Sequence, residues 1–115
     1  MIFIYTTCKN KKEAEKIGLH LVKKQLVACV NIFPLIKSIF SWQGKIEKKS
    51  ESVLIIKTKK ENFAKIEKDI KKISGFTTPC ILEIPIARGN KDYLKWIEKE
   101  VKWNGVLTTV LKKVK

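Results

Sequence analysis

The chain has 115 residues, of which 44% are apolar and 31% charged, so it is long enough for one domain with its own hydrophobic core. No window approaches the roughly eighteen uninterrupted apolar residues of a membrane-spanning helix. Three cysteines, Cys8, Cys29 and Cys80, are an odd number without CxxC spacing, which argues against a disulfide framework and a tetrahedral zinc site. We expect a single domain over residues 1–115.

The net charge of +14 comes from 24 lysines and one arginine, Arg88, against eleven acidic residues. Proteins that read bases or clamp phosphates rely mainly on arginine, and here the lysines are spread over every polar segment. We expect no specific nucleic-acid partner, only weak, salt-sensitive binding to polyanions. The N-terminus lacks the basic region of a signal peptide, so we expect a cytoplasmic protein without membrane association.

The first two predicted elements are a strand and a helix. The β-rich run Ile2–Thr6 predicts a strand that Thr7-Cys8 ends, and Asn10 followed by Glu13 resembles a capping box. Apolar residues then recur at helical spacing on one face: Ala14, Ile17, Gly18, Leu21 and Val22. The only histidine, His20, falls among lysines on the other side, and we expect it at the surface.

The middle of the chain is a long apolar run, Leu26–Glu47, whose β-branched and aromatic residues favour strand over helix. Pro34 interrupts it and predicts a bulge, bend or edge position. Gln43-Gly44 closes a hairpin, and the polar return arm Lys45–Glu51 leads into a buried strand, Val53–Ile56. A small domain cannot cover a strand of this length alone, so we expect another copy of the chain to cover part of it.

Three further elements are predicted: an amphipathic helix over Lys59–Ile73, a strand over Cys80–Ala87, and a helix that opens at Gly89-Asn90. The tail after Trp103 fits either a strand or a final helical turn. The order βαββαβ plus a terminal helix predicts an α+β ferredoxin-like sandwich, in which two helices cover one face of a four-stranded antiparallel sheet.

The sequence resembles a known family in segments that follow the family order over about residues 2–101. These segments are Leu26–Ile32, Ser38–Trp42, Gly44–Glu47, Ile55–Thr58, Thr78-Pro79, Leu82–Ile86 and Tyr93–Ile97. They make the chain similar to the CutA divalent-cation tolerance proteins. The resemblance implies a ferredoxin-like protomer, a tight homotrimer built through extended strands, and no established enzymatic activity. It also implies tolerance to copper and other divalent cations, binding of a metal or small ligand, an unknown protein partner, and a likeness to the nitrogen-regulatory PII proteins.

The resemblance also implies a copper ligand, Cys8, although the histidine pair of the copper-binding members falls at Ile73 and Ser74 here. Copper prefers imidazole and thiolate ligands, so one cysteine without nearby histidine is a poor divalent site. The alternative is a packed or idle Cys8 thiol, and with it a structural or scaffolding trimer without a functional metal site.

A ligand cleft between subunits is implied as well, with Cys80 and Phe76 standing where the family commonly has glutamate and tyrosine. This replacement predicts a less acidic and less polar cleft, faced by Trp42, Glu47 and Lys57. The alternative for the last two is a Glu47–Lys57 pair across the hairpin.

Assembly and catalysis give two more expectations. Because buried aromatic anchors dominate interface energies, we expect the trimer interface at Ile39, Phe40 and Trp42. No catalytic constellation is evident, since His20 has no nucleophile signature around it. The only two aspartates, Asp69 and Asp92, lie on predicted helices among lysines, which argues against a carboxylate-bound magnesium site.

Overall fold

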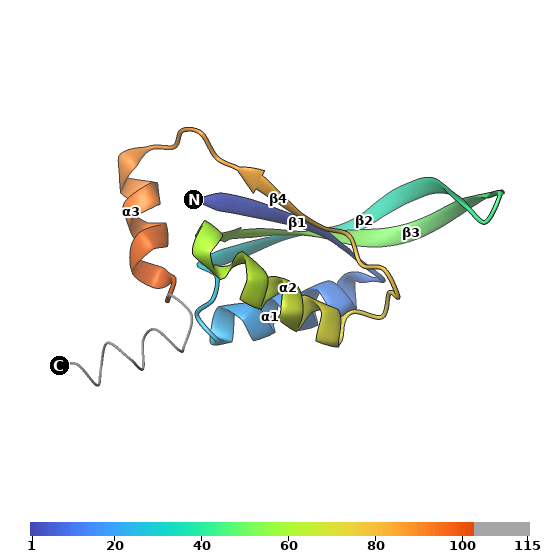
Figure 1. The fold of residues 1–115 in the computed structure, drawn as a ribbon, viewed down its shortest axis with the longest axis horizontal. Helices are drawn as coiled ribbons and strands as arrows, with labels where there is room; N and C mark the ends of the chain where they lie inside the picture. The colour runs from blue at the N-terminus through green and yellow to red at the C-terminus, as the bar shows by residue number, and fades with distance from the viewer. Residues whose placement is uncertain (103–115) are drawn as a thin grey trace.

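The computed structural model describes residues 1–102. Its elements are β1 (Ile2–Cys8), α1 (Lys11–Lys23), β2 (Cys29–Trp42), β3 (Lys45–Thr58), a short 3-10 helix η1 (Lys60–Asn62), α2 (Phe63–Ile73), β4 (Ile81–Pro85) and α3 (Lys91–Glu100). One antiparallel sheet has the strand order β2-β3-β1-β4, with α1 and α2 on one face and α3 beyond one end (Figure 1). The predicted α+β architecture with a long hairpin and a C-terminal helix is confirmed. The predicted strand or turn after Trp103 lies outside the described residues.

The core lies between this sheet and the two helices, and alternation along β1 shows which face is buried. Residues Ile2, Ile4, Thr6 and Cys8 are buried, whereas those between them are half-buried. The main apolar residues of the core are Ile4, Ile17, Leu21, Leu54, Ile56, Ile66 and Ile70. Gly18 lets α1 approach the sheet closely, because a Cβ there would lie only 2.9 Å from Val30 Cγ2.

Element ends differ from the sequence expectations where pairing decides them. Strand β1 continues to Cys8, because Thr7 and Cys8 pair with Val53 and Ser52 of β3. Strand β4 is shorter than predicted, since it ends where Pro85 pairs with Ile2 at the start of β1. The helix predicted from Lys59 begins as the η1 turn and becomes α-helical at Phe63. The Asn10 cap is confirmed, since its side chain accepts the Glu13 N–H at 2.9 Å.

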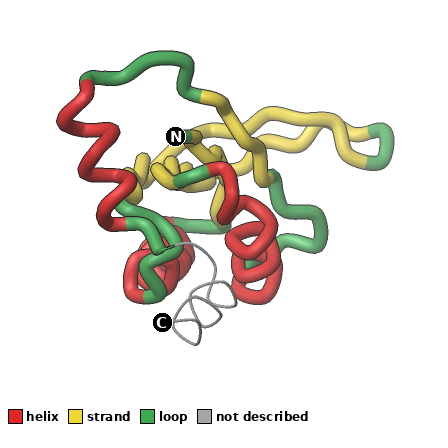
Figure 2. The backbone as a smooth tube through the Cα atoms, turned by 60° about the vertical axis from the view of Figure 1, so that its left-hand side comes forward, coloured by secondary structure: helices red, strands yellow, loops and turns green. Residues whose placement is uncertain are grey.

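The hairpin of β2 and β3 extends beyond the rest of the sheet, and we call its outer part, residues 36–51, the arm. Strand β1 ends opposite Ser52, so the arm is a two-stranded ribbon without a third strand within residues 1–102 (Figures 1 and 2). The predicted irregularity at Pro34 is confirmed as a register shift between Phe33 and Ile36. Positive φ angles at Gln43 (51°) and Gly44 (78°) form the tight turn at its tip. The arm makes the molecule 57 Å long but only 30 by 23 Å across.

The sheet face turned away from α1 and α2 is apolar, and we call it the open face. Register places apolar residues from all four strands on it: Phe3, Tyr5, Phe33, Val53, Ile55, Leu82 and Ile84. Phe33, Leu82 and Ile84 are exposed. At one end of this face, Lys57 donates to Tyr93 Oη of α3 at 3.2 Å and lies over the Phe3 ring at 5.8 Å. On this face, Phe33 of β2 and Leu82 and Ile84 of β4 are therefore uncovered in the described protomer, whereas Val53 of β3 is buried.

A buried carboxylate, Asp69 of α2, ties the two covering helices together. It accepts hydrogen bonds from His20 (2.9 Å) and Lys24 (3.1 Å) on one oxygen and from Lys65 (3.0 Å) on the other. Its side chain is only 2% exposed. Burial raises the pKa of Asp69, but the hydrogen bonds from His20, Lys65 and Lys24 outweigh it and hold the pKa well below its usual range. His20, which we expected at the surface, is instead half-buried as a partner of this carboxylate.

Replacing Asp69 should destabilise the fold in a pH-dependent way. Asp69→Asn should lower the free energy of unfolding by about 2 kcal/mol near neutral pH, because it removes the charge that three donors share. The folded-state pKa lies below the unfolded value of 3.8, so this stabilisation is present above about pH 4 and is lost as pH falls through the folded pKa.

Urea unfolding at about pH 7 and about pH 3 should therefore show a smaller deficit for the variant in acid. Asp92→Asn, at the exposed first turn of α3, is the matched control and should change stability by about 0.5 kcal/mol or less. Equal losses in the two variants would contradict this account of Asp69.

Candidate functional site

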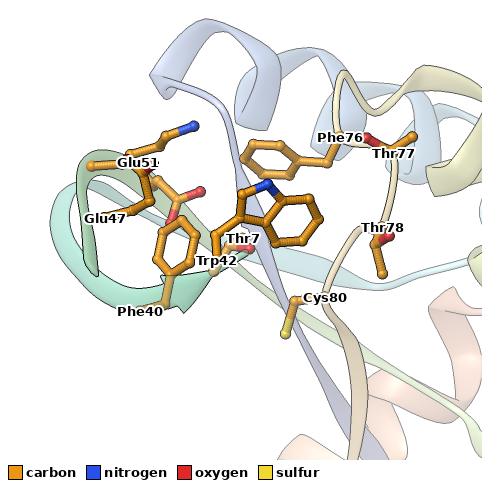
Figure 3. A pocket seen from close by; sticks show the side chains of 10 residues that line it. Thr7, Phe40, Trp42, Glu47, Glu51, Phe76, Thr77, Thr78 and Cys80 are labelled. Atoms are coloured by element: carbon orange, nitrogen blue, oxygen red, sulfur yellow. The ribbon is translucent and has the colours of Figure 1, made fainter. Parts of the chain in front are cut away.

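A pocket of about 310 Å³ lies where the arm meets the loop that follows α2 (Figure 3). Its lining residues come from β1, both strands of the arm and the loop: Thr7, Phe40, Trp42, Glu47, Lys49, Glu51, Phe76, Thr77, Thr78 and Cys80. Segments far apart in the sequence therefore build one concave site.

Strand geometry places the arm's contribution to the pocket. Phe40 pairs with Glu47 and Trp42 with Lys45, so the aromatic and acidic side chains share one face of the ribbon. The period of two continues along β3 from Glu47 to Lys49 and Glu51. Figure 3 shows the Trp42 indole turned toward Phe76, with Phe40 and Glu47 on the arm side.

The loop side of the pocket is held by hydrogen bonds to the start of α1. Glu13 accepts the N–H of Gly75 at 3.0 Å with one carboxylate oxygen and that of Lys9 at 2.9 Å with the other. One residue further on, the N–H of Phe76 donates to Ser74 Oγ at 3.1 Å. The position of the Phe76 ring thus depends on a glutamate that lies outside the pocket.

Burial and a nearby carboxylate both change the pKa of the Cys80 thiol in this pocket. Burial, followed by the negative charge of Glu51, raises the pKa of Cys80. Replacing the expected glutamate by Cys80 has therefore not left the pocket without acidic groups, because Glu47 and Glu51 both line it. A cleft less acidic and less polar than in the relatives stays a prediction.

Four of the five residues predicted for the cleft, Trp42, Glu47, Phe76 and Cys80, line this pocket. Lys57 does not, since its contacts are with Phe3 and Tyr93 at the far end of β3. The alternative Glu47–Lys57 pair across the hairpin is wrong, because both residues lie on β3 and their cross-strand partners are Phe40 and Cys29.

Sequence reasoning missed six of the pocket residues: Thr7, Phe40, Lys49, Glu51, Thr77 and Thr78. Counting every second residue from Glu47 would have found Lys49 and Glu51 once the arm was recognised as one continuous strand. Thr7 had no such signal, because its place depends on the extension of β1 beyond the predicted end.

Cys8, the predicted metal residue, lies in the core on the helix-facing side of β1 and is fully buried. Burial, with smaller contributions from Glu13 and Glu51, raises the pKa of its thiol to about 12, so the thiol stays protonated at neutral pH. Within residues 1–102, no group of three or more His, Cys, Asp or Glu side chains is arranged to hold a metal ion. The surroundings of Cys8 in one protomer therefore do not fit copper.

The positions of the missing histidine pair have structural contacts. Ile73 packs against the hydrophobic core, and the N–H of Ser74 donates to the Ile70 carbonyl at the end of α2. The single histidine, His20, is bound to Asp69 instead.

The three residues predicted for the trimer interface are all exposed in the protomer: Ile39 by 63%, Phe40 by 37% and Trp42 by 53%. They are divided between the two faces of the arm, because Ile39 alternates with Phe40. Phe40 and Trp42 line the pocket, whereas Ile39 shares the reverse face with Ile46, which is 71% exposed. Their role in assembly stays a prediction.

The whole described fold matches one protein family. Residues 2–100 match the model of the CutA1 divalent ion tolerance protein family. The chain belongs to this family. The family is named for tolerance to divalent ions, and the Archaeoglobus relative described next carries the same description.

Two relatives show how far the similarity extends. The divalent-cation tolerance protein CutA of Archaeoglobus fulgidus is 50% identical over 99 residues, which cover 86% of this chain and 96% of that protein. The solved structure of that organism's CutA has a TM-score of 0.85 and 48% identity, and covers 89% of this chain and 100% of its own. The CutA1 structure from Oryza sativa has a TM-score of 0.87 and 31% identity, over 90% and 94% of the two chains.

Location varies among these relatives. The Archaeoglobus structure is described as a periplasmic protein, and a rice protein that is 32% identical over 101 residues, 88% of this chain and 57% of that protein, is described as chloroplastic. In the described part of this chain no helix is long and apolar enough to cross a membrane. A cytoplasmic location stays a prediction.

Copper should not bind through Cys8. Calorimetric titration with Cu(II) should give the same isotherm for the wild type and for Cys8→Ser, because the thiol is buried, protonated and without neighbouring ligands. Cys80→Ser, at the half-buried pocket thiol, is the control for nonspecific thiol binding. Tight binding abolished only by Cys8→Ser would show that the assembled protein exposes a site that the protomer lacks.

Proposed function

We propose that this chain acts as a homotrimer in the response to divalent cations, and that it works by binding a small ligand in the arm pocket and signalling to a protein partner. The observation that carries the proposal is the combination of exposed apolar side chains on the open face with a protruding arm that exposes Ile39, Phe40, Trp42 and Ile46. Both features lie in the segment shared with a family of divalent-cation tolerance proteins.

The open face supports assembly on energetic grounds. A second copy on the open face would remove the apolar surface of Phe33, Leu82 and Ile84 from water. Each Å² removed stabilises the complex by about 25 cal/mol. Exposed apolar side chains on one face of a sheet are typical of a surface that another chain covers. A neighbouring copy is the occupant that the family resemblance favours.

The arm supports the same conclusion independently. A two-stranded ribbon is at best marginally stable by itself in water, and this one exposes Ile39 and Ile46 on its reverse face. Contact with a neighbour would bury these side chains and hold the ribbon in place.

Direct copper binding is not part of this proposal. The absent histidine pair and the buried Cys8 thiol favour a trimer that responds to cations through a ligand or partner. A scaffolding trimer without a functional metal site is the second candidate, and the same two observations favour it. Binding of a small ligand in the arm pocket would favour the first candidate, and an empty pocket would favour the scaffolding trimer.

A charge on the open face should dissociate the assembly. Leu82→Glu should raise the concentration at which subunits dissociate at least tenfold, because burying an uncompensated carboxylate at an interface is costly. Light scattering coupled to size-exclusion chromatography should give the mass of three chains for the wild type and a smaller mass for the variant.

Leu19→Glu is the matched control, since Leu19 is 57% exposed against 56% for Leu82 but lies on the outer side of α1. It should leave the trimer mass unchanged. A wild-type protein that is monomeric at micromolar concentration would contradict the proposal.

A further inference from the structure

We propose that the arm pocket binds a small organic cation, held against the face of Trp42 with Glu47 as its counter-charge. This inference rests on the proposed function in one respect, namely that the pocket is a ligand site. It adds the chemical class of the ligand, and it requires no metal ion.

Three aromatic rings from two parts of the chain meet in the pocket. Phe40 and Trp42 come from β2 at the end of the arm, and Phe76 comes from the loop after α2 (Figure 3). Aromatic faces attract cations through their quadrupole, and indole does so most strongly. Trp42 is 53% exposed, so packing within the described protomer does not bury its indole ring.

Two carboxylates in the same pocket have no counter-ion, in a chain where cations are abundant. The chain has 25 basic and 11 acidic residues. Five acidic residues have a hydrogen-bond or ion-pair partner: Glu13, Glu15, Glu67, Asp69 and Glu98. Among residues 1–102, neither Glu47 nor Glu51 has an ion pair within 4.0 Å or a side-chain hydrogen bond. The same holds for Glu61, Glu83, Asp92 and Glu100, but none of these four lines the pocket.

Lys49 lies between the two glutamates on the same face of β3 and also lines the pocket. Its ammonium group is not within 4.0 Å of either carboxylate, so it offsets one negative charge without closing the site. The pocket keeps a net negative charge of about one at neutral pH. This balance disfavours an anionic ligand and leaves a cationic ligand as the complementary one.

A divalent metal ion fits the same groups poorly. Glu47 and Glu51 are four residues apart on one strand, or about 13 Å along it, so they cannot readily converge on one small ion. Hard divalent cations need six or more oxygen ligands, and no suitable cluster is present in the described residues. An organic cation spreads its charge over methyl or methylene groups, which suits one carboxylate beside aromatic faces.

The volume sets the size of the ligand. At about 310 Å³ the pocket is at the lower end of the range for small-molecule sites, so the fitting molecule is small. A quaternary ammonium group with a short substituent satisfies the size, the charge and the aromatic lining together. Choline is therefore a suitable probe, and 3,3-dimethyl-1-butanol is its neutral isostere, with carbon in place of the quaternary nitrogen.

Calorimetric titration of the wild-type protein at about 0.15 M salt tests the inference. Choline should bind saturably, at least tenfold more tightly than 3,3-dimethyl-1-butanol. Glu47→Gln, which keeps the shape of the side chain, should weaken choline binding at least fivefold. Glu83→Gln, at an exposed glutamate of β4 outside the pocket, should leave it unchanged.

Trp42→Leu gives a second readout, because it removes the aromatic face and keeps an apolar side chain; it should weaken choline at least fivefold without weakening the neutral isostere. Equal affinity for the two probes, no saturable choline binding, or a Glu47→Gln variant that binds normally would each overturn the inference. Light scattering on the same samples separates the two claims. A trimer that does not bind choline refutes the cation site alone, whereas a monomer refutes the proposed function.

Discussion

One constraint governs this protein: two helices cover one face of the sheet, while the strands carry apolar side chains on both. Alternation along β1 sends Ile2 and Ile4 to the helices and Phe3 and Tyr5 to the open face. Helices α1 and α2 are held on one face of the sheet by the core and by the Asp69 hydrogen bonds, so they cannot cover the open face. Within residues 1–102, the contact with α3 covers only one end of the open face, so Phe33, Leu82 and Ile84 stay exposed in the described protomer.

The pocket is a consequence of the same extended strands. Because β2 and β3 run past the end of β1, their pairing continues into a ribbon that places Phe40 and Trp42 opposite acidic and basic residues of β3. The loop after α2, held by Glu13, brings Phe76 and Cys80 to meet them. The extended hairpin of β2 and β3 thus both exposes apolar surface and forms one side of the pocket.

Sequence patterns predicted the elements, the Pro34 irregularity and the Gln43-Gly44 turn, because each depends on local periodicity or backbone preference. They did not predict what depends on pairing across the sheet. The place of Lys57 beside α3 and the extra length of β1 both follow from register. The His20–Asp69 bond was equally out of reach, since it joins residues 49 positions apart on two helices whose facing sides the sequence does not specify.

The central claim is that neighbouring copies cover the open face and the arm, and hydrogen exchange of the arm's backbone amides tests it most directly. A two-stranded ribbon alone in water opens easily, so its amides should exchange quickly unless another chain holds it. The account predicts that amides of residues 36–51 are protected to a degree comparable with those of β1 at micromolar protein concentration. Fast exchange throughout the arm, together with strong protection of β1, would contradict it.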